Sequence, residues 1–317
     1  MTAIETYDLT KYYGVLCAVD HLSLSVDNEI FALLGPNGSG KTTTVLMLTT
    51  LLRPTSGAAT VCGYDCVTKG EMVRKKLSYV PQDMAVDIRL TGRENVVFFA
   101  KLYGVSHPRE QADEALALLE LADRADDLVK TYSGGMRRRL ELAQALVHEP
   151  AVLFLDEPTL GLDVAARKKI WEHIRELRHR GMTVFVTTHY MDEADRFCDR
   201  VAIISHGSIK AIGRPKDLKA QLMKDVITAK ISGEYTAFES DGIRFLGRKE
   251  DEVSFTAENG REALPLIAEA LATRGMKVHS LSLHEPTLDD VFLNVVGNSD
   301  EPRSFNDKQF RVMLRRR

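Results

Sequence analysis

A glycine-rich loop near the N-terminus has the composition of a phosphate-binding site. It reads Gly35-Pro36-Asn37-Gly38-Ser39-Gly40-Lys41-Thr42, the pattern G-x4-G-K-[ST], and lies between a predicted strand and a predicted helix. Its glycines let successive backbone N–H groups turn toward an anion, and the start of the helix adds partial positive charge. Lys41 is suited to contact the β- and γ-phosphates, and the Thr42 hydroxyl to bind Mg²⁺. We expect a nucleotide here, with Thr43 among its contacts.

Two neighbouring carboxylates follow a second apolar run. Val152-Leu153-Phe154-Leu155 reads as a buried strand and is followed directly by Asp156 and Glu157. Because side chains alternate along a strand, the two carboxylates are predicted to point to opposite sides. Asp156 is suited to hold Mg²⁺ through a water molecule, and Glu157 to polarise a water that attacks phosphate. An acidic strand end on the surface would have the same sequence, but the phosphate loop upstream favours the catalytic interpretation.

A serine and two glycines precede a predicted helix at Arg137–Val147. The stretch reads Thr131-Tyr132-Ser133-Gly134-Gly135-Met136. Ser133 is a good N-cap residue, which is the usual meaning of Ser-Gly before a helix. The alternative is a second anion site, formed by the Ser133 hydroxyl and the amides of Gly134 and Gly135 at the helix N-terminus. The residues by themselves leave both interpretations open.

The elements that must position these residues read as an α/β fold. Ile30–Leu34 is a continuous apolar run, typical of a strand buried on both faces of a parallel sheet, and Thr42–Leu52 reads as the helix after the loop. Strand, loop and helix in this order begin a doubly wound unit. Further predicted strands are Ile4–Leu9, Leu22–Val26, Ala151–Leu155, Thr183–Thr187 and Val201–Ile204, with helices at Ala165–Arg178 and Met191–Phe197.

The chain is predicted to have three parts besides this core. Residues of about 83–150 have helical periodicity and form an insert far longer than an ordinary connection. After residue 215 the pattern changes, and residues 216–298 read as a small α+β module. The stretch Glu301–Arg317, within a tail of 299–317, has a net charge of +4 and no apolar face, so we expect a flexible basic tail with weak affinity for anionic surfaces.

In order and spacing, the motifs resemble those of the ATP-binding subunits of ABC transporters, over about residues 4–215. The resemblance implies a P-loop core with an N-terminal antiparallel β subdomain and an inserted helical subdomain, binding ATP and Mg²⁺. It also implies roles for further residues. Gln82 corresponds to the glutamine of the Q-loop, near the metal and the attacking water, and His189 to the switch histidine. Tyr13 would stack on adenine, while Ser133, Gly134, Gly135 and Asp163 would face nucleotide.

Within this family, two stretches are similar to the ATPases of drug, antibiotic and lipid-type exporters, such as the daunorubicin-resistance ATPases. They are His189–Asp195 and His284–Phe292, and they extend the resemblance to about residue 297. The second stretch would also fit a plain helix cap followed by an amphipathic helix. The resemblance implies a separate membrane permease as partner and a second ATPase subunit, arranged so that Ser133 of one subunit covers the nucleotide held by Lys41 of the other. A soluble ABC ATPase of translation or DNA repair is the alternative function.

Composition excludes other classes. The 317 residues include 42 Lys and Arg against 45 Asp and Glu, so a net charge of −3 gives no general attraction to nucleic acid. Apolar runs stop at five residues, where a membrane-spanning helix needs about 20. The N-terminus lacks the basic start and apolar stretch of a signal peptide. We expect a chain that remains at the cytoplasmic side of the membrane, attached through its permease, with four cysteines that have no chemical role.

Overall fold

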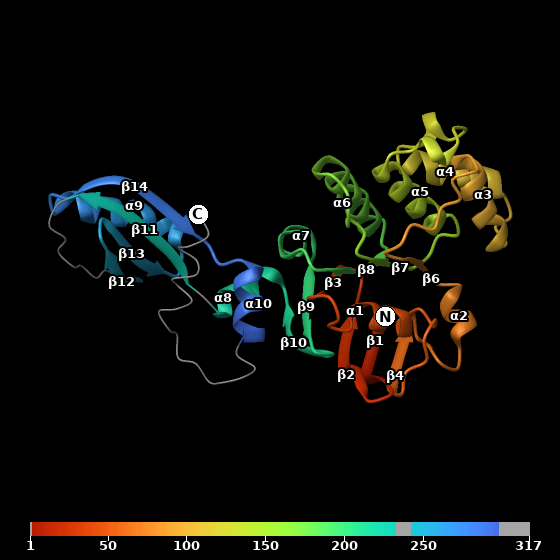
Figure 1. Cartoon of the computed structure of the whole chain (residues 1–317), viewed down its shortest axis with the longest axis horizontal. Helices are drawn as coiled ribbons and strands as arrows, with labels where there is room; N and C mark the ends of the chain where they lie inside the picture. The colour runs from red at the N-terminus through yellow and green to blue at the C-terminus, as the bar shows by residue number, and fades with distance from the viewer. Residues whose placement is uncertain (1, 223, 233–241, 298–317) are drawn as a thin grey trace. The chain divides into compact units, whose positions relative to one another are not determined.

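The computed structural model describes residues 2–222, 224–232 and 242–297. The chain divides into two compact units, Met1–Pro215 and Lys216–Arg317 (Figure 1). The stretch Glu301–Arg317, expected to be a basic tail, lies outside the described residues. Among the described helices, none combines the length and the apolar composition needed to cross a lipid bilayer.

The first unit is built on a six-stranded sheet with the order β10-β9-β3-β8-β7-β6. Its strands are β3 (Ile30–Leu34), β6 (Leu77–Val80), β7 (Val152–Asp156), β8 (Thr183–Thr188), β9 (Arg200–Ser205) and β10 (Ser208–Gly213). All neighbours pair in parallel except β10, which is antiparallel to β9. The rings of Phe31, Phe185 and Phe154 contact one another across β3, β8 and β7, with centroids 5.4 Å apart. The α/β prediction is confirmed.

Four helices of this unit directly precede or follow a strand of the central sheet along the chain: α1 (Lys41–Leu48), α2 (Gly70–Arg74), α6 (Val164–His179) and α7 (Met191–Phe197). Helix α1 ends four residues before the predicted end. Thr50 has φ +66°, in the left-handed region, so the helical backbone cannot continue to Leu52. Helix α1 contacts β7, and this packing brings the start of α1 toward the strand that ends in Asp156.

An antiparallel sheet with the order β2-β1-β4-β5 forms the N-terminal part. Its strands are β1 (Ile4–Tyr13), β2 (Leu16–Val26), β4 (Ser56–Val61) and β5 (Tyr64–Asp65). The two long strands extend well beyond the predicted Ile4–Leu9 and Leu22–Val26. Asp8 and His21 have positive φ, and the register of β1 with β2 shifts at several points, so the inside-outside alternation is interrupted where the prediction stopped.

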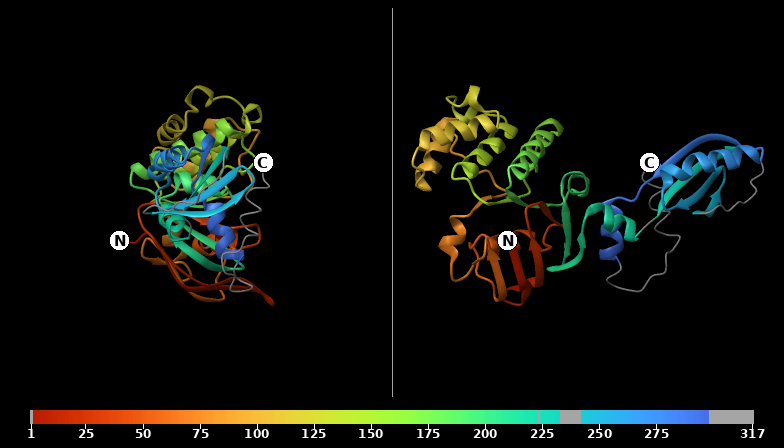
Figure 2. Two further views of the ribbon diagram at one scale, coloured as in Figure 1. Left: turned by 90° about the vertical axis from the view of Figure 1, so that its left-hand side faces the viewer. Right: turned by 180° about the vertical axis from the view of Figure 1, so that it is seen from behind.

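Three helices fold between β6 and β7: α3 (Gly92–Leu102), α4 (Pro108–Leu118) and α5 (Gly134–Leu146). They pack against one another. Thr91 and Glu94 form a capping box at the start of α3, and Pro108 occupies the first turn of α4. The helical insert lies on the opposite side of the central sheet from the N-terminal sheet (Figure 2).

The second unit contains a four-stranded antiparallel sheet with the order β12-β13-β11-β14. Its strands are β11 (Asp225–Ser232), β12 (Ile243–Lys249), β13 (Glu252–Ala257) and β14 (Lys277–His284); its helices are α9 (Gly260–Thr273) and α10 (Leu288–Gly297), and α8 (Pro215–Leu222) begins it. Ile227, Phe255 and Ile267 belong to one buried cluster between the sheet and α9. This is the small α+β module that the sequence predicts.

Candidate active site

The glycine-rich loop packs so closely against neighbouring backbone that two of its positions have no room for a side chain. It connects β3 to α1, and Gly38 and Gly40 have φ of +79° and +105°, a backbone conformation that favours glycine. A Cβ atom at Gly35 would lie 2.3 Å from the carbonyl oxygen of Ile204, and one at Gly40 would lie 2.4 Å from that of Ala18. Both glycines are therefore required by close packing. Within the loop, the N–H of Gly35 donates to the carbonyl oxygen of Thr188 and that of Ser39 to the carbonyl oxygen of Pro36.

Lys41 is buried at the start of α1, with 5% of its surface exposed. Its ammonium group donates hydrogen bonds to the carbonyl oxygens of Gly35 and Pro36, at 2.8 and 3.2 Å. It also lies 3.3 Å from Oε1 of Glu157, which is equally buried. The cation of the phosphate loop and the proposed catalytic carboxylate are thus direct neighbours. Thr42 and Thr43 follow, the first exposed and the second half-buried.

Asp156 and Glu157 were predicted to point to opposite sides because side chains alternate along a strand, but this reason does not apply to Glu157. Strand β7 ends at Asp156, and Glu157 has φ +48°, so the alternation of a strand does not extend to it. Thr187 on β8 stabilises this turn: its hydroxyl donates to Oδ1 of Asp156 and accepts a hydrogen bond from the Glu157 N–H at 3.1 Å. A left-handed non-glycine residue costs about 1–3 kcal/mol, and such strain concentrates at functional sites.

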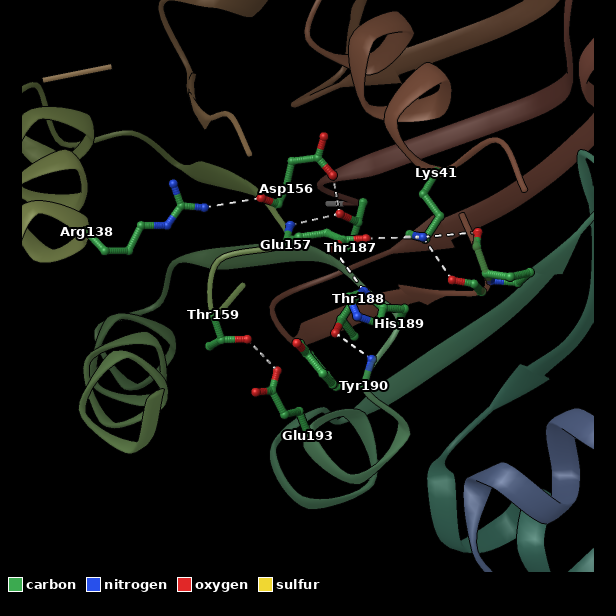
Figure 3. Close-up of polar contacts among 12 residues, drawn as sticks. Lys41, Arg138, Asp156, Glu157, Thr159, Thr187, Thr188, His189, Tyr190 and Glu193 are labelled. Atoms are coloured by element: carbon green, nitrogen blue, oxygen red, sulfur yellow. Dashed lines mark hydrogen bonds and ion pairs between the residues drawn. The ribbon is translucent and has the colours of Figure 1, made fainter. Parts of the chain in front are cut away.

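The Glu157 carboxylate lies between two partners (Figure 3). Its Oε1 pairs with Lys41, and its Oε2 lies 2.9 Å from Nδ1 of His189, which follows β8. A carboxylate only accepts, so Nδ1 of His189 carries the proton in this contact. Parallel pairing of β7 with β8 brings the ends of the two strands together and hence the two side chains. The structure therefore assembles Lys41, Asp156, Glu157 and His189 at one edge of the sheet.

The same edge offers oxygen atoms that fit a bound Mg²⁺. Oδ2 of Asp156 and Oγ of Ser39 are buried side-chain atoms without a hydrogen-bond partner within the described residues. A buried carboxylate oxygen with no donor is costly unless a cation or water satisfies it, and Mg²⁺ prefers carboxylate and hydroxyl oxygens. Burial, together with the nearby Asp156 carboxylate, raises the pKa of Tyr79 to about 12. Tyr79 keeps its proton and faces the Asp156 carboxylate as a hydrogen-bond donor.

Two predicted site residues, Gln82 and Tyr13, are exposed. Gln82 is exposed in the loop after β6, two residues beyond Val80, which pairs with Leu155 of β7. The loop thus begins beside the end of the strand that carries Asp156. Tyr13, 47% exposed, is the last residue of β1, and the Lys11 ammonium lies 5.4 Å from the centre of its ring.

The serine-glycine motif lies elsewhere in the unit, at the contact between α5 and α6. The Ser133 hydroxyl accepts from the N–H of Met136 at 3.3 Å, so Ser133 does cap α5. A Cβ at Gly135 would lie 2.7 Å from that of Ala166, so the first turns of the two helices touch. Asp163 caps α6 by accepting from Ala166 at 2.8 Å. Ser133 and Asp163 thus share a neighbourhood on elements other than those that carry Lys41.

Arg138 is a structural residue of the site that the sequence analysis did not identify. It lies on α5, is buried, and donates to the carbonyl oxygens of Pro81, Asp156 and Pro158 at 2.8, 3.2 and 3.0 Å. It also pairs with Glu141 at 2.8 Å. One side chain therefore connects the serine-glycine helix with the ends of β6 and β7. The sequence places it inside a run of three arginines, which does not indicate which member is buried.

The relatives of this chain share nearly its whole length. The chain is 41% identical over 313 residues to the daunorubicin/doxorubicin resistance ATP-binding protein DrrA of Streptomyces peucetius, covering 95% of this chain and 94% of that protein. A family model described as ABC transporter matches residues 19–160. The chain belongs to the ABC transporter family. As a member, it is an ATP-hydrolysing subunit of a transporter. A second model, for the C-terminal domain of DrrA1-3-like ATP-binding proteins, matches residues 213–296.

Other comparisons agree with this family. The linearmycin resistance ATP-binding protein LnrL of Bacillus subtilis is 37% identical over 309 residues, covering 93% of this chain and 99% of that protein. The solved structure of an ATP binding subunit of an ABC transporter is 30% identical, with a TM-score of 0.62 over 69% of this chain and 92% of that one. The dimeric, post-hydrolysis ATP-binding cassette MJ0796, bound to ADP and Pi, is 26% identical, with a TM-score of 0.60 over 67% and 98%. The ABC ATPase fold of the first unit follows from these likenesses.

Proposed function

We propose that the loop from Gly35 to Thr43 binds the phosphates of ATP and that the nearby acidic residues carry out hydrolysis. Lys41 neutralises the β- and γ-phosphates. Thr42, Asp156 and Gln82 hold a Mg²⁺ ion, which would offset the negative charge that develops on the phosphate oxygens. Glu157 orients the attacking water and accepts its proton, and His189 holds Glu157 and the γ-phosphate in register.

The observation that carries this proposal is the position of Glu157 between Lys41 and His189. A general base must lie within hydrogen-bonding distance of both its orienting group and the reacting atoms. Glu157 contacts the cation that holds phosphate and the imidazole that can orient the base. A carboxylate serving only as a surface charge would have no reason to be buried between these groups.

We propose further that two copies, or this chain and a close relative, sandwich the nucleotide. Ser133, Gly134 and Gly135 begin α5, on elements separate from the Lys41 cluster, so one chain uses its two anion-facing motifs in different sites. A head-to-tail pair supplies each nucleotide with both motifs, as two-fold symmetry requires. Tyr13 stacks on the base. The likeness to the dimeric MJ0796 cassette supports this arrangement.

The proposed partner in the membrane is a separate permease that docks on the helical insert. The insert and the loop before it carry exposed apolar side chains at Met84, Ile88, Phe98, Leu102 and Tyr103. Tyr103 and Ala85 also line a small cleft against β6. Apolar side chains exposed around a cleft are typical of protein interfaces. Attachment to such a permease would hold this chain at the cytoplasmic side of the membrane, where ATP is available.

The proposed cargo is a drug-like, antibiotic or lipid-type molecule that is exported. DrrA and LnrL are named for resistance to daunorubicin/doxorubicin and linearmycin, and YbhF of Escherichia coli, 43% identical over 230 residues, is named as a probable multidrug transporter ATP-binding protein. Resistance relatives favour an exporter over the soluble alternative in translation or DNA repair. No residue of this chain is proposed to contact the cargo.

Co-purification tests the proposal. The chain is expressed with a candidate multi-span permease, such as one encoded next to it, and the two should co-purify from detergent. Vesicles that contain the pair should move an amphiphilic drug only with ATP, and not when the chain carries Glu157→Gln. The variant Phe98→Asp should weaken co-purification without reducing ATP binding. A chain that purifies alone and hydrolyses ATP only with ribosomes or DNA would support the soluble alternative.

A further inference from the structure

A second contact joins the two segments that carry Glu157 and His189. Thr159 lies two residues beyond Glu157, and its hydroxyl donates to Oε2 of Glu193 at 2.8 Å (Figure 3). Glu193 lies on α7, four residues beyond His189. Both side chains are almost fully buried, at 1% and 2% exposed. A carboxylate this deep in the protein is stable only when its oxygens have partners, so the contact has a strong physical reason to persist.

Helix α6 also contacts the stretch from Tyr190 to Glu193, through Arg167. Nε of Arg167 lies 3.2 Å from Oε1 of Glu193. The Arg167 guanidinium also lies 4.6 Å from the ring centre of Tyr190, the residue directly after His189 and the N-cap of α7. Burial raises the pKa of Glu193, while the side chains of Thr159, Trp171 and Arg167 oppose that shift. Glu193 and Tyr190 therefore connect the start of α7 to Thr159 and Arg167, which follow Glu157 in the chain.

These contacts have one exposed side. Thr159 is buried, whereas Leu160 and Val164 on either side of the following turn are exposed, Val164 at 82%. Helix α7 has seven residues, too few to be stable without tertiary contacts. His189 lies between the end of β8 and Tyr190, the N-cap of α7, so its position depends on what holds α7 in place as well as on β8.

We propose that Glu193 is a positioning residue, which holds His189 against Glu157 by accepting the hydrogen bond of Thr159 and pairing with Arg167. The inference rests on the roles proposed above for Glu157 and His189. When the Thr159–Glu193 contact is lost, α7 loosens and His189 leaves Glu157 for part of the time.

The test uses the full chain with Thr159→Val, Thr159→Ser and Glu193→Gln. Valine keeps the shape of threonine but removes its hydroxyl; serine keeps the hydroxyl; glutamine keeps an acceptor for Thr159 but removes the charge that faces Arg167. Thr159→Val should lower kcat for ATP hydrolysis about tenfold, with KM changed less than about threefold, because the nucleotide contacts remain. Thr159→Ser should keep the wild-type kcat, and the kcat of Glu193→Gln should lie between those of Thr159→Val and Thr159→Ser.

A readout that needs no activity is amide hydrogen exchange of residues 189–197 in the nucleotide-free chain. Exchange there should be about tenfold faster in Thr159→Val than in wild type and unchanged in Thr159→Ser. Thr6→Val is the matched control: Thr6 is buried and accepts a hydrogen bond from Leu24 in the N-terminal sheet. It should change neither kcat nor this exchange.

Two results would overturn the inference. One is wild-type kcat and wild-type exchange in both Thr159→Val and Glu193→Gln, when the separate variant Glu157→Gln has lost ATP hydrolysis as proposed. The other is faster exchange over the whole first unit in Thr159→Val, and not only over residues 189–197, which would make the contact a general stabiliser. A Glu157→Gln chain that hydrolyses ATP at the wild-type rate would instead contradict the proposed catalytic role of Glu157, whatever happens at Thr159.

Discussion

The Lys41 ammonium and the Glu157 carboxylate form an ion pair, with Nζ 3.3 Å from Oε1 and both side chains almost fully buried. The partners come from α1 and from the end of β7, more than a hundred residues apart in sequence. A triphosphate that binds to Lys41 competes with Glu157 for the same cation. In the proposed mechanism, binding would therefore release the Glu157 carboxylate for hydrolysis, and one charge would link the two steps.

Replacing Glu157 by glutamine separates the two steps. The amide cannot accept a proton from water, so turnover should fall by about 10²–10⁴. Because Lys41 loses a competing anion, ATP should bind at least as tightly as to wild type, and an ATP-bound dimer should accumulate. Phosphate release, nucleotide titration and size-exclusion chromatography with Mg-ATP measure the three quantities. Glu71→Gln, at an exposed carboxylate on α2 paired with Lys75, is the control.

Replacing Lys41 by alanine should weaken binding and turnover together. In its proposed role Lys41 contacts phosphate in the ground state and in the transition state alike, so its loss should affect both. We expect ATP affinity to fall at least about tenfold, or about 1.4 kcal/mol. Lys75→Ala removes an exposed lysine of the same charge and should leave the affinity unchanged. Normal ATP affinity in Lys41→Ala would contradict the assignment of the phosphate loop.

Two substitutions of Ser133 distinguish its capping role from a role at the dimer interface. Ser133→Ala removes the hydroxyl that accepts from Met136 and should cost about 1 kcal/mol of unfolding free energy. Ser133→Arg should also block the surface that faces the partner's phosphates. In a Glu157→Gln background the arginine variant should bind ATP and remain monomeric by size-exclusion chromatography. Normal dimerisation would mean that Ser133 serves only as a helix cap.

Tyr13 provides a test of base recognition. Its ring is about half exposed at the end of β1, so alanine can replace it with little loss of packing. Tyr13→Ala should weaken ATP binding by about 1–3 kcal/mol, the scale of one base-aromatic stack. Tyr13→Phe keeps the ring and should bind ATP nearly as well as wild type. Equal damage from both substitutions would show that the hydroxyl, and not stacking, matters.

His148 gives the fold a sensitivity to acid. Burial lowers the pKa of its imidazole, opposed by a contact with the Leu77 carbonyl, and its ring stacks on Tyr103 at 3.8 Å. The unfolded chain takes up a proton near pH 6.5 while the folded one resists it, so the unfolding free energy falls as pH drops from 7 toward 5. His148→Phe keeps the stack and removes the titration. Urea unfolding at pH 7 and pH 5 should show a smaller loss in the variant than in wild type.

Local patterns predict the motifs and several elements of this chain, but they do not predict the strands β4 (Ser56–Val61) and β6 (Leu77–Val80). An apolar run such as Ile30–Leu34, followed directly by a glycine-rich loop, favours a short strand buried on both faces, as in a parallel sheet covered by helices. The phosphate loop is recognisable because its function depends on consecutive backbone amides, which require glycines at fixed spacing. The register of β1 with β2 was not predicted, because positive φ at Asp8 and His21 depends on the partner strand.

Only the tertiary structure decides which side chains meet. Glu157 contacts Lys41 and His189 because parallel pairing aligns the ends of β7 and β8 and because a left-handed turn at Glu157 redirects its carboxylate. Arg138 and Glu193 are each buried by the packing of their helix, and each contacts residues far away in the sequence. A run of charged residues does not indicate which of its members is buried. Motifs are local in sequence, whereas ion pairs and hydrogen bonds between distant segments depend on the packing of the whole unit.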